Sequence, residues 1–391
     1  MSVGIVGNYG NNNSGDEAIL EGILIQLKEV YNIEREEITV FSNQPELMSE
    51  KYGVKSAKLY YKNKNALLTA ATTISKNKSI IRDLDLLIIG GGGIYMDLYG
   101  REAFIFGMYG WLAKLSKTPV VLYGVGAGPI LTQIGKVILR SLAHLSKLVT
   151  VRDPKSKELM RSIGVKSEIY EIGDPAFRLN VPKDVKKSNK GLQVGVTAVP
   201  YHHISYWPTE DKEKYQNYIK GMANNLDNLL TKYPDAQINF FATKHPQDSM
   251  VTEEIQKLMT YKERTKVNNN DLNHNEIVEF EGKQDLIIGT RLHSLILALV
   301  TNTPIIAVSY HHKVNDFMEM IGCSDKNILI EQLNDNPNFF YETYKNMESN
   351  WEDTIKQFED ISSIMKAKAI KGMELIEQTV GADSFGKNSR T

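Results

Sequence analysis

The chain has 391 residues, of which 46 are Lys or Arg and 47 are Asp or Glu, and its formal net charge at neutral pH is −1. This balance excludes an overall positive field, so we expect no nucleic-acid partner and no general attraction of the chain to an anionic membrane. The only cysteine, Cys323, excludes an intramolecular disulfide framework and an all-cysteine metal site. The chain is longer than the chains that usually fold around a single hydrophobic core, so we predict two domains.

No segment of the sequence is typical of a leader peptide or a membrane span. The amino terminus enters a strand-like run directly, without a basic region before it. The longest apolar runs, 86–90 and 295–300, are far shorter than the ~20 residues of a membrane-spanning helix. We therefore expect a cytoplasmic protein without a transmembrane segment, which can still visit the inner face of the membrane to reach a substrate.

The first half of the chain alternates short apolar runs with amphipathic segments. Residues 3–7 are typical of a buried strand, and an apolar stripe at helical spacing follows over 16–31. Further strands are expected at 38–42, 84–90, 118–124, 147–153 and 167–174, with helices at 104–116 and 131–146. Continuous apolar strands that alternate with helices predict a parallel sheet covered on both faces.

Residues 178–191 interrupt this pattern with Lys, Asn, one Pro and a closing Gly, a composition typical of a linker. A second series follows, with strands expected at 192–199, 237–245, 285–289 and 304–310, and a helix at 211–233. We therefore predict an α/β fold with two Rossmann-like domains on parallel sheets, at 1–180 and 190–340, and a ligand cleft between them. The pattern at 341–379 predicts a C-terminal helix over 341–380 that packs back across the domains, before a flexible tail at 381–391.

Glycines crowd the carboxyl ends of three predicted strands, in the segments 7–17, 90–93 and 124–129. Glycine permits positive φ angles and the close approach of a ligand, and the amides of a helix start suit an anion or a hydroxyl-rich ligand. The first segment, GNYGNNNSGDE, has neither the P-loop nor the dinucleotide-binding spacing. Its simpler interpretation is that Ser14 or Asp16 caps the first helix. Three such segments after strands of one sheet favour a ligand site at that edge.

Arg152 is a cation at a predicted strand end. Asp153 and Pro154 follow it and suit the N-cap and the first position of a helix, which leaves the Arg152 side chain at the edge of the sheet. A ligand contact and a surface ion pair with Asp153 or Glu158 are both open interpretations. Asp174, after the next strand, is either part of a turn or the partner that holds Arg152.

Arg291 and His293 begin a predicted helix directly after the strand at 285–289. A cation at a helix N-terminus is locally unfavourable, because the helix dipole is positive there. This pair therefore indicates an anionic ligand that offsets the cost.

The remaining histidines give weaker signals. Strands precede His202, His203, His245, His311 and His312, whereas His274 is expected in a solvated Asn-rich loop and His144 in a structural position on a helix. No group of these residues has metal-ligand spacing, so no metal site is predicted.

Six segments in one order together resemble the polysaccharide pyruvyl transferase family. They are GNYGNNNSGDEAIL (7–20), IIGGGGIYMD (88–97), YGVGAGP (123–129), VTVRDPKS (149–156), IGDPAF (172–177) and IGTRLHSLILAL (288–299). The resemblance implies a fold similar to two-domain glycosyltransferases of the GT-B type. It also implies transfer of pyruvate from phosphoenolpyruvate to a sugar of a cell-wall polysaccharide, an exopolysaccharide or a precursor, which forms a ketal and releases phosphate.

By this resemblance, the phosphoenolpyruvate site consists of Arg152, Arg291, Leu292 and His293, because guanidinium groups pair well with a carboxylate and a phosphate. Arg291 and His293 would also serve the reaction, with His293 in proton transfer, since an imidazole titrates near neutrality. Asp16 would take a proton from an acceptor hydroxyl. Phosphoenolpyruvate is a co-substrate here, and no cofactor and no metal are implied.

The resemblance places the saccharide acceptor against the first loop and the glycine run. Its contacts would be Tyr9, Asn12, Asn13, Gly92 and Gly93. The family's acceptors imply a lipid-linked or a nucleotide-linked saccharide.

Two rival functions stay open. A nucleotide-sugar glycosyltransferase of this fold usually carries a Glu seven residues before the Pro of its second-domain donor motif, but the position that precedes Pro304 in this way is Leu297. A non-catalytic saccharide-binding protein has no need of Arg152, Arg291 and His293.

One segment departs from the family pattern. Many members carry an acidic residue after the Tyr that corresponds to Tyr310, whereas His311, His312 and Lys313 follow it here. We expect this change to add positive charge near a donor phosphate.

Overall fold

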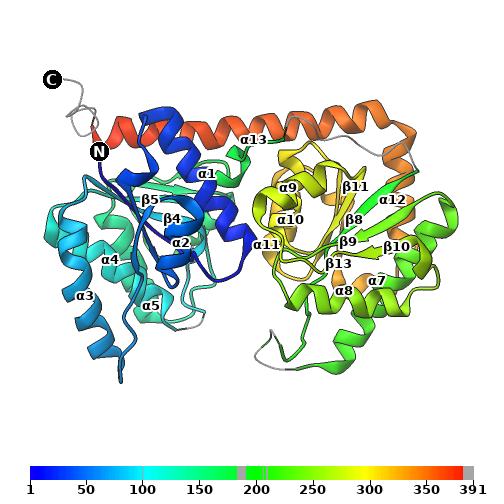
Figure 1. The fold of residues 1–391 in the computed structure, drawn as a ribbon, viewed down its shortest axis with the longest axis horizontal. Helices are drawn as coiled ribbons and strands as arrows, with labels where there is room; N and C mark the ends of the chain where they lie inside the picture. Colours follow the sequence, from blue (N-terminus) through cyan, green and yellow to red (C-terminus); the bar gives the residue numbers. More distant parts are fainter. Residues whose placement is uncertain (99, 183–190, 206, 208–209, 382–391) are drawn as a thin grey trace. The chain divides into compact units, whose positions relative to one another are not determined.

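The computed structural model describes residues 1–98, 100–182, 191–205, 207 and 210–381. The chain forms two compact units (Figure 1). Unit 1 comprises Met1–Asn11, Asp16–Arg178 and the chain from Met365, and unit 2 comprises Asn12–Gly15 and Leu179–Ile364. Much of the predicted linker and nearly all of the predicted flexible tail, 183–190 and 382–391, lie outside the described residues.

Unit 1 contains a parallel sheet of seven strands in the order β3-β2-β1-β4-β5-β6-β7. The strands are β1 (Val3–Val6), β2 (Ile38–Ser42), β3 (Lys55–Lys58), β4 (Leu86–Tyr95), β5 (Val120–Ala127), β6 (Leu148–Val151) and β7 (Tyr170–Glu171). The connecting helices are α1 (Ser14–Tyr31), α2 (Pro45–Tyr52), α3 (Ala66–Arg82), α4 (Glu102–Ser116), α5 (Gln133–Leu145) and α6 (Pro154–Ser162). Strand β1 pairs in parallel with β2 and with β4, and Val3 lies opposite Ile38 and Leu86. This pairing confirms the predicted parallel sheet.

Unit 2 contains a second parallel sheet, of six strands in the order β10-β9-β8-β11-β12-β13. The strands are β8 (Gln193–Val196), β9 (Gln237–Phe240), β10 (Thr265–Val267), β11 (Leu286–Gly289), β12 (Ile305–Ser309) and β13 (Asn327–Leu329). The helices are α7 (Lys212–Lys232), α8 (Gln247–Leu258), α9 (His274–Gly282), α10 (Leu292–Val300), α11 (His312–Met320), α12 (Phe339–Ser349) and α13 (Trp351–Val380). The two sheets confirm the predicted fold class.

The glycines at 90–93 and 124–126 are strand residues, so β4 and β5 extend beyond the strands predicted at 84–90 and 118–124. Gly90 pairs with Tyr123, and the β4–β5 register shifts only after Gly92. The register shift directly follows two successive glycines, Gly91 and Gly92, which have φ angles of 76° and 86°. Because glycine alone adopts this conformation freely, the run lets β4 bend and continue to Tyr95.

The edge strands account for most of the other differences. β3, β10 and β13 were not predicted, and the strand expected at 167–174 shrinks to the two residues of β7. All four lie at the edges of their sheets, where a strand is short and only partly covered. Such strands lack the continuous apolar run on which the prediction depended.

Two further predictions in unit 2 were wrong. The expected helix over 341–380 is two helices that meet at Asn350, whose φ of −135° and ψ of 56° are not helical. His274 is 2% exposed and begins α9, because Asn273 and Glu276 form a capping box in the segment expected to be a solvated loop. The spacing of apolar residues does not reveal a helix break of one residue or a helix-capping box.

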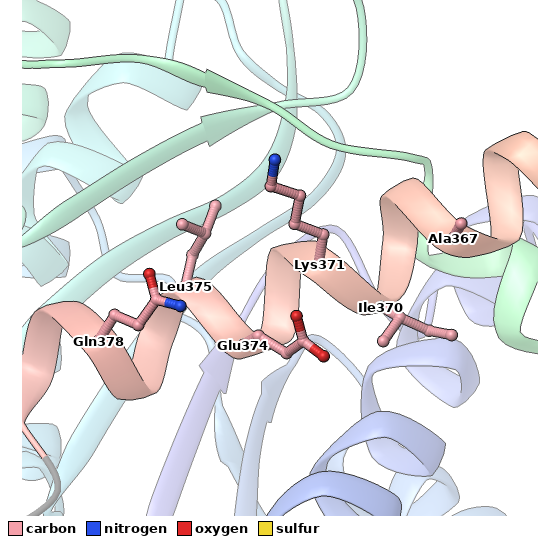
Figure 2. Close-up of a pocket in the computed structure, with 6 residues that line it drawn as sticks. All are labelled: Ala367, Ile370, Lys371, Glu374, Leu375 and Gln378. Carbon is pink, nitrogen blue, oxygen red and sulfur yellow. The ribbon is translucent and has the colours of Figure 1, made fainter.

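The last part of α13 packs on unit 1. Tyr31 donates a hydrogen bond to the carbonyl of Met373, and a Cβ on Gly173 would lie 2.3 Å from the carbonyl oxygen of Met365. A shallow pocket lies along this segment, with lining side chains that include Lys371 and Glu374 (Figure 2). None of the predicted site residues lines this pocket.

Candidate functional site

Each sheet has one point where the strand order reverses. In unit 1 the chain proceeds outward from β1 to β3 and then returns to β4, on the other side of β1. Unit 2 repeats this path, so that its reversal lies between β8 and β11. Ligands of open α/β sheets bind outside the carboxyl ends of the strands at such a point. Asp16 follows β1, Gly92 lies in the carboxyl-terminal half of β4, and Arg291 follows β11.

In unit 1 the structure brings Asp16 next to Gly92. Asp16 is 7% exposed, and its Oδ2 accepts a hydrogen bond of 2.9 Å from Asn8 Nδ2. A Cβ on Gly92 would lie 3.0 Å from Asp16 Oδ1. The bulged glycines therefore leave room for the carboxylate at the end of β4, and Gly93 beside them is half-buried.

Tyr9 does not have the position expected of an acceptor contact. It is fully buried, and its hydroxyl donates to the carbonyl of Gly90 at 2.7 Å. Burial, together with the nearby carboxylates of Asp16 and Asp174, raises the pKa of Tyr9 far above its usual range. Tyr9 thus has a structural role, because its buried hydroxyl holds the backbone of β4 at Gly90.

Arg152, directly after β6, is held by the buried carboxylate of Asp174. Its NH1 donates to Asp174 Oδ2 at 2.9 Å, and both side chains are less than 10% exposed. Asp153 Oδ2 lies 3.8 Å from Arg152 Nε while Asp153 caps α6, as predicted. A Cβ on Gly126 would lie 3.0 Å from Arg152 Nε, so the guanidinium packs closely on the β5 backbone. The sequence had left the role of Asp174 open, and the structure assigns it to Arg152.

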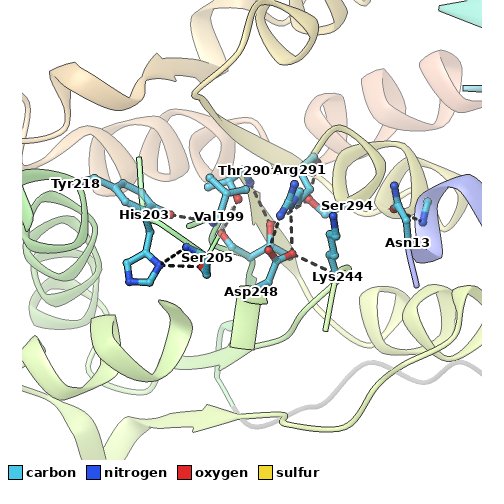
Figure 3. A network of polar contacts seen from close by, with 12 residues as sticks. Asn13, Val199, His203, Ser205, Tyr218, Lys244, Asp248, Thr290, Arg291 and Ser294 are labelled. Atoms are coloured by element: carbon cyan, nitrogen blue, oxygen red, sulfur yellow. Dashed lines mark hydrogen bonds and ion pairs between the residues drawn. The ribbon is translucent and has the colours of Figure 1, made fainter. Parts of the chain in front are cut away.

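In unit 2, threonine side chains join the ends of β8 and β11. Thr290 N donates to Thr197 Oγ1 at 3.0 Å, and Thr290 Oγ1 donates to Thr197 O at 3.2 Å. Ser294 Oγ donates to Arg291 O at 2.7 Å and lies 3.1 Å from Thr197 Oγ1. Figure 3 shows this network around Arg291. These bonds fix the turn on which Arg291, Leu292 and His293 lie, and all three side chains are half-buried.

Asp248 holds the Arg291 side chain through two hydrogen bonds. Arg291 NH2 donates to Asp248 Oδ1 at 2.6 Å, and Nε donates to Oδ2 at 3.2 Å. Asp248 is fully buried and also accepts a bond from the backbone N–H of Lys244 at 3.1 Å (Figure 3). The guanidinium is therefore oriented before any ligand arrives. No sequence pattern pointed to Asp248, which lies 43 residues from Arg291 in an ordinary amphipathic helix.

His293 lies against the start of α1. A Cβ on Gly15 would be 2.1 Å from His293 Nδ1, so only glycine fits at this position. Asn13 Oδ1 accepts a bond of 3.2 Å from Gly15 N, and Ser14 Oγ donates to the carbonyl of Leu272 at 2.8 Å. The Asn12–Gly15 segment thus belongs to unit 2 with His293, and Asn12 has a φ of 50°.

The histidines after β12 differ from the expectation. His311 caps α11 by accepting a bond from Lys313 N, and its ring lies 4.0 Å from that of His312. Burial, with smaller effects of His312 and Lys313, lowers the pKa of His311 to about 4. His311 is therefore neutral at pH 7 and does not add the positive charge that we expected from it.

Among the aromatic side chains beside the reversal point, Trp207 was not singled out from the sequence. His202 stacks on Trp207 with ring centroids 4.5 Å apart, and Tyr310 meets Trp207 edge-on at 6.4 Å. His202 has a φ of 53°, which is unusual for a residue with a side chain. The loops after β8 and β12 thus meet next to the end of β11. In the part of the chain that the structure describes, no three His, Cys, Asp or Glu residues are grouped as metal ligands.

The family model for polysaccharide pyruvyl transferases matches residues 13–312. The chain belongs to the polysaccharide pyruvyl transferase family. The family match contains Asp16, Arg152, Arg291 and His293, whereas Tyr9 precedes it. This membership confirms the family resemblance seen in the sequence. The family consists of transferases of polysaccharide biosynthesis.

A curated relative of this family member is the amylovoran biosynthesis protein AmsJ of Erwinia amylovora. It is 22% identical, over 86% of this chain and 89% of its own length. Among solved structures, the chain is similar to a putative UDP-N-acetylglucosamine 2-epimerase from Listeria monocytogenes, with a TM-score of 0.68 and 13% identity over 96% of each chain. The UDP-GlcNAc 2-epimerase of Neisseria meningitidis gives a TM-score of 0.66 and 14% identity, over 97% of this chain and 99% of that chain. At such identities these structures establish the GT-B-like fold alone.

Proposed function

We propose that the protein transfers pyruvate from phosphoenolpyruvate to a sugar of a cell-surface polysaccharide or its precursor. In this reaction two acceptor hydroxyl oxygens bond to C2 of the donor, C3 gains a proton, and the bond from C2 to the phosphate oxygen breaks. One hydroxyl proton balances the proton gained at C3, and the other leaves with the phosphate. The products are a pyruvate ketal and inorganic phosphate.

The observation that carries this proposal is the Arg291–Leu292–His293 turn in a chain of this family. The turn lies at the strand reversal of unit 2, at the N-terminus of α10, where amide groups and the helix dipole favour an anion. Arg291 is oriented by Asp248, and a fixed guanidinium binds phosphate or carboxylate with little loss of conformational freedom. His293 next to it has the chemistry to hold or deliver a proton.

The remaining roles belong to residues of unit 1 and to the Asn12–Gly15 segment. Arg152, fixed by Asp174, binds an anionic group of phosphoenolpyruvate, and Asp16 accepts a proton from an acceptor hydroxyl. Asn12, Asn13 and the bulged glycines of β4 contact the saccharide. No cofactor has a part in this scheme.

A nucleotide-sugar donor is the less favoured function. The position at which such glycosyltransferases usually carry a ribose-binding Glu is Leu297, which is fully buried within α10. A non-catalytic saccharide-binding role does not explain why Arg152 and Arg291 are held in fixed orientations.

The decisive experiment measures phosphate release from phosphoenolpyruvate with a panel of saccharide acceptors. We expect release only when an acceptor is present, and a product that gains the mass of a pyruvate ketal. Glycosyl transfer from a UDP-sugar instead, or no release with any acceptor, would refute the proposal.

Calorimetry of phosphoenolpyruvate binding tests the donor residues. Arg291→Ala and Arg152→Ala should each weaken binding at least about 30-fold, because an anionic group loses its partner. Arg82→Ala, an exposed arginine outside the site, is the matched control and should bind normally. Unchanged affinity in both site variants would show that the donor site is misplaced.

The proposal includes a location. Within the described ranges, no helix combines the length and the apolar character needed to span a bilayer. We place the enzyme in the cytoplasm, where it meets lipid-linked precursors at the inner face of the membrane.

A further inference from the structure

The outer surface of α3, α4 and α5 in unit 1 is unusually apolar. In the described part of the chain, ten of the seventeen large hydrophobic residues with exposed side chains lie between positions 67 and 137. They are Leu67, Leu68, Ile74, Leu98, Phe104, Trp111, Leu115, Leu131, Ile134 and Val137. We call the surface that these residues and the intervening polar positions form the α3–α5 face.

The helix α4 is apolar on both of its sides. Its inner side, with Phe106, Tyr109 and Leu112, belongs to the hydrophobic core of unit 1. On the outer side, Phe104, Trp111 and Leu115 follow one another at spacings of seven and four residues and are 54%, 51% and 71% exposed. A surface helix of a globular protein normally turns a polar side to water. The outer stripe of α4 therefore indicates a partner that is itself apolar.

Close packing joins the three helices into one surface. A Cβ on Gly107 of α4 would lie 2.3 Å from Ile138 of α5, so glycine lets these two helices approach closely. On the other side of α4, Tyr109 accepts a hydrogen bond of 2.8 Å from Asn77 of α3. Figure 1 shows the three helices next to one another. The exposed residues of α5, Ile134 and Val137, thus continue the stripe of α4.

The charge of these segments is strongly positive. Residues 60–85 and 98–147 contain eleven Lys and Arg residues against three acidic residues, Asp83, Asp85 and Glu102, and Asp83 pairs with Arg82. All eleven cations except the half-buried Lys136 are exposed. The whole chain has a net charge of −1, so this face is basic and the rest of the molecule is acidic. The near-neutral total conceals this asymmetry.

We infer that the α3–α5 face docks on an anionic lipid membrane. Exposed Trp, Phe, Leu and Ile side chains enter the boundary between headgroups and acyl chains, and the surrounding Lys and Arg residues pair with anionic headgroups. A polyanionic saccharide matches the charge but not the apolar stripe, and a second copy of this face would repel it. The inference deepens the membrane location proposed above and is independent of the pyruvyl chemistry.

Vesicle flotation tests the inference directly, with the full chain and vesicles of phosphatidylcholine with or without phosphatidylglycerol. We expect binding that requires phosphatidylglycerol and weakens at high salt. The triple variant Phe104→Ser, Trp111→Ser and Leu115→Ser should bind at least about 100-fold more weakly, because the apolar anchor is lost. Lys114→Gln with Lys117→Gln should reduce binding about 30-fold.

Matched controls come from unit 2. Leu258→Ser removes an exposed leucine, and Lys257→Gln with Lys262→Gln removes two exposed lysines. These variants should bind like the unchanged protein. In the variant Trp207→Phe with Trp351→Phe, Trp111 is the only tryptophan, and its emission should shift to the blue when anionic vesicles are added.

Three outcomes would overturn the inference. They are no binding to anionic vesicles, binding that the α4 substitutions leave unchanged, and self-association in solution that these substitutions abolish while vesicles are not bound. Phosphate release with a water-soluble acceptor should be the same in the triple serine variant of α4, in Lys114→Gln with Lys117→Gln, and in the unit 2 controls Leu258→Ser and Lys257→Gln with Lys262→Gln. Loss of vesicle binding therefore leaves the proposed reaction intact, and failure of the reaction leaves the vesicle result valid.

Discussion

Gly15→Ala is a small substitution with a large predicted effect on activity. The added Cβ would lie 2.1 Å from His293 Nδ1 and 2.4 Å from Cγ. Non-bonded carbon and nitrogen atoms prefer separations of roughly 3.5 Å, so the His293 ring must move by more than about 1 Å. A displacement of about 1 Å in a reacting group typically costs about 100-fold in rate.

The substitution should also destabilise the fold. The added Cβ would lie 2.8 Å from the His293 Cβ, which a turn of the ring does not move, so the backbone must shift as well. Overpacking of this kind typically costs about 1–3 kcal/mol. We therefore expect a lower melting temperature and, at a temperature where the variant is still folded, a value of kcat/KM for phosphoenolpyruvate reduced about 100-fold.

A double-mutant cycle makes this prediction specific. Phosphate release is measured for Gly15→Ala, for His293→Ala and for the two together. If Gly15 acts through the imidazole, Gly15→Ala should cost little once His293 is alanine. Activity of Gly15→Ala within about threefold of the unchanged protein, or an equal loss in the His293→Ala background, would refute the reasoning.

Three other substitutions test buried groups. Asp248→Ala leaves the Arg291 guanidinium without its buried carboxylate and should reduce the free energy of unfolding by about 3–5 kcal/mol, measured by denaturant titration. Burial raises the pKa of Glu281 well above 4.5, so the free energy of unfolding should fall as pH rises from about 4.5, by up to about 1.4 kcal/mol per pH unit, and Glu281→Gln should remove this dependence. Tyr9→Phe should lose about 1 kcal/mol of stability through its bond to Gly90 and leave KM for the acceptor unchanged.

For each of these three predictions, one outcome would contradict it. Asp271→Asn, at an exposed position, is the control for Asp248, and equal stability of the two variants would argue against the buried pair. A pH profile of Glu281→Gln that matches the unchanged protein would assign the titration to another group. A raised KM for the acceptor in Tyr9→Phe would return Tyr9 to the acceptor site.

Local sequence patterns were sufficient for the general architecture. Runs such as 3–7 and 285–289 are buried on both faces of their sheets, so their apolar residues are continuous and easily recognised. Arg152 and Arg291 follow directly after such strands, and Asp153 carries its own capping signal. These features depend on neighbours within a few residues, which is the range over which propensity and capping act.

The glycine run of β4 (90–93) is a case in which neighbours within a few residues do not determine the structure. A run of glycines is typical of a loop, yet Gly90 has a partner across the sheet in Tyr123, and pairing with β5 keeps the run extended. Edge strands such as β3 are likewise defined by their neighbour more than by their own composition. Cross-strand pairing is a tertiary property, and propensity does not predict it.

The sequence by itself determined the family, the two parallel sheets and the positions of the cationic residues at strand ends, because each depends on short segments of chain. Only the tertiary structure decided that Asp248 holds Arg291, that Gly15 makes room for His293, and that one face of unit 1 gathers the positive charge which the net value of −1 conceals. These relations join residues tens to hundreds of positions apart. Such residues meet only when burial of the apolar strands and helices brings distant segments together.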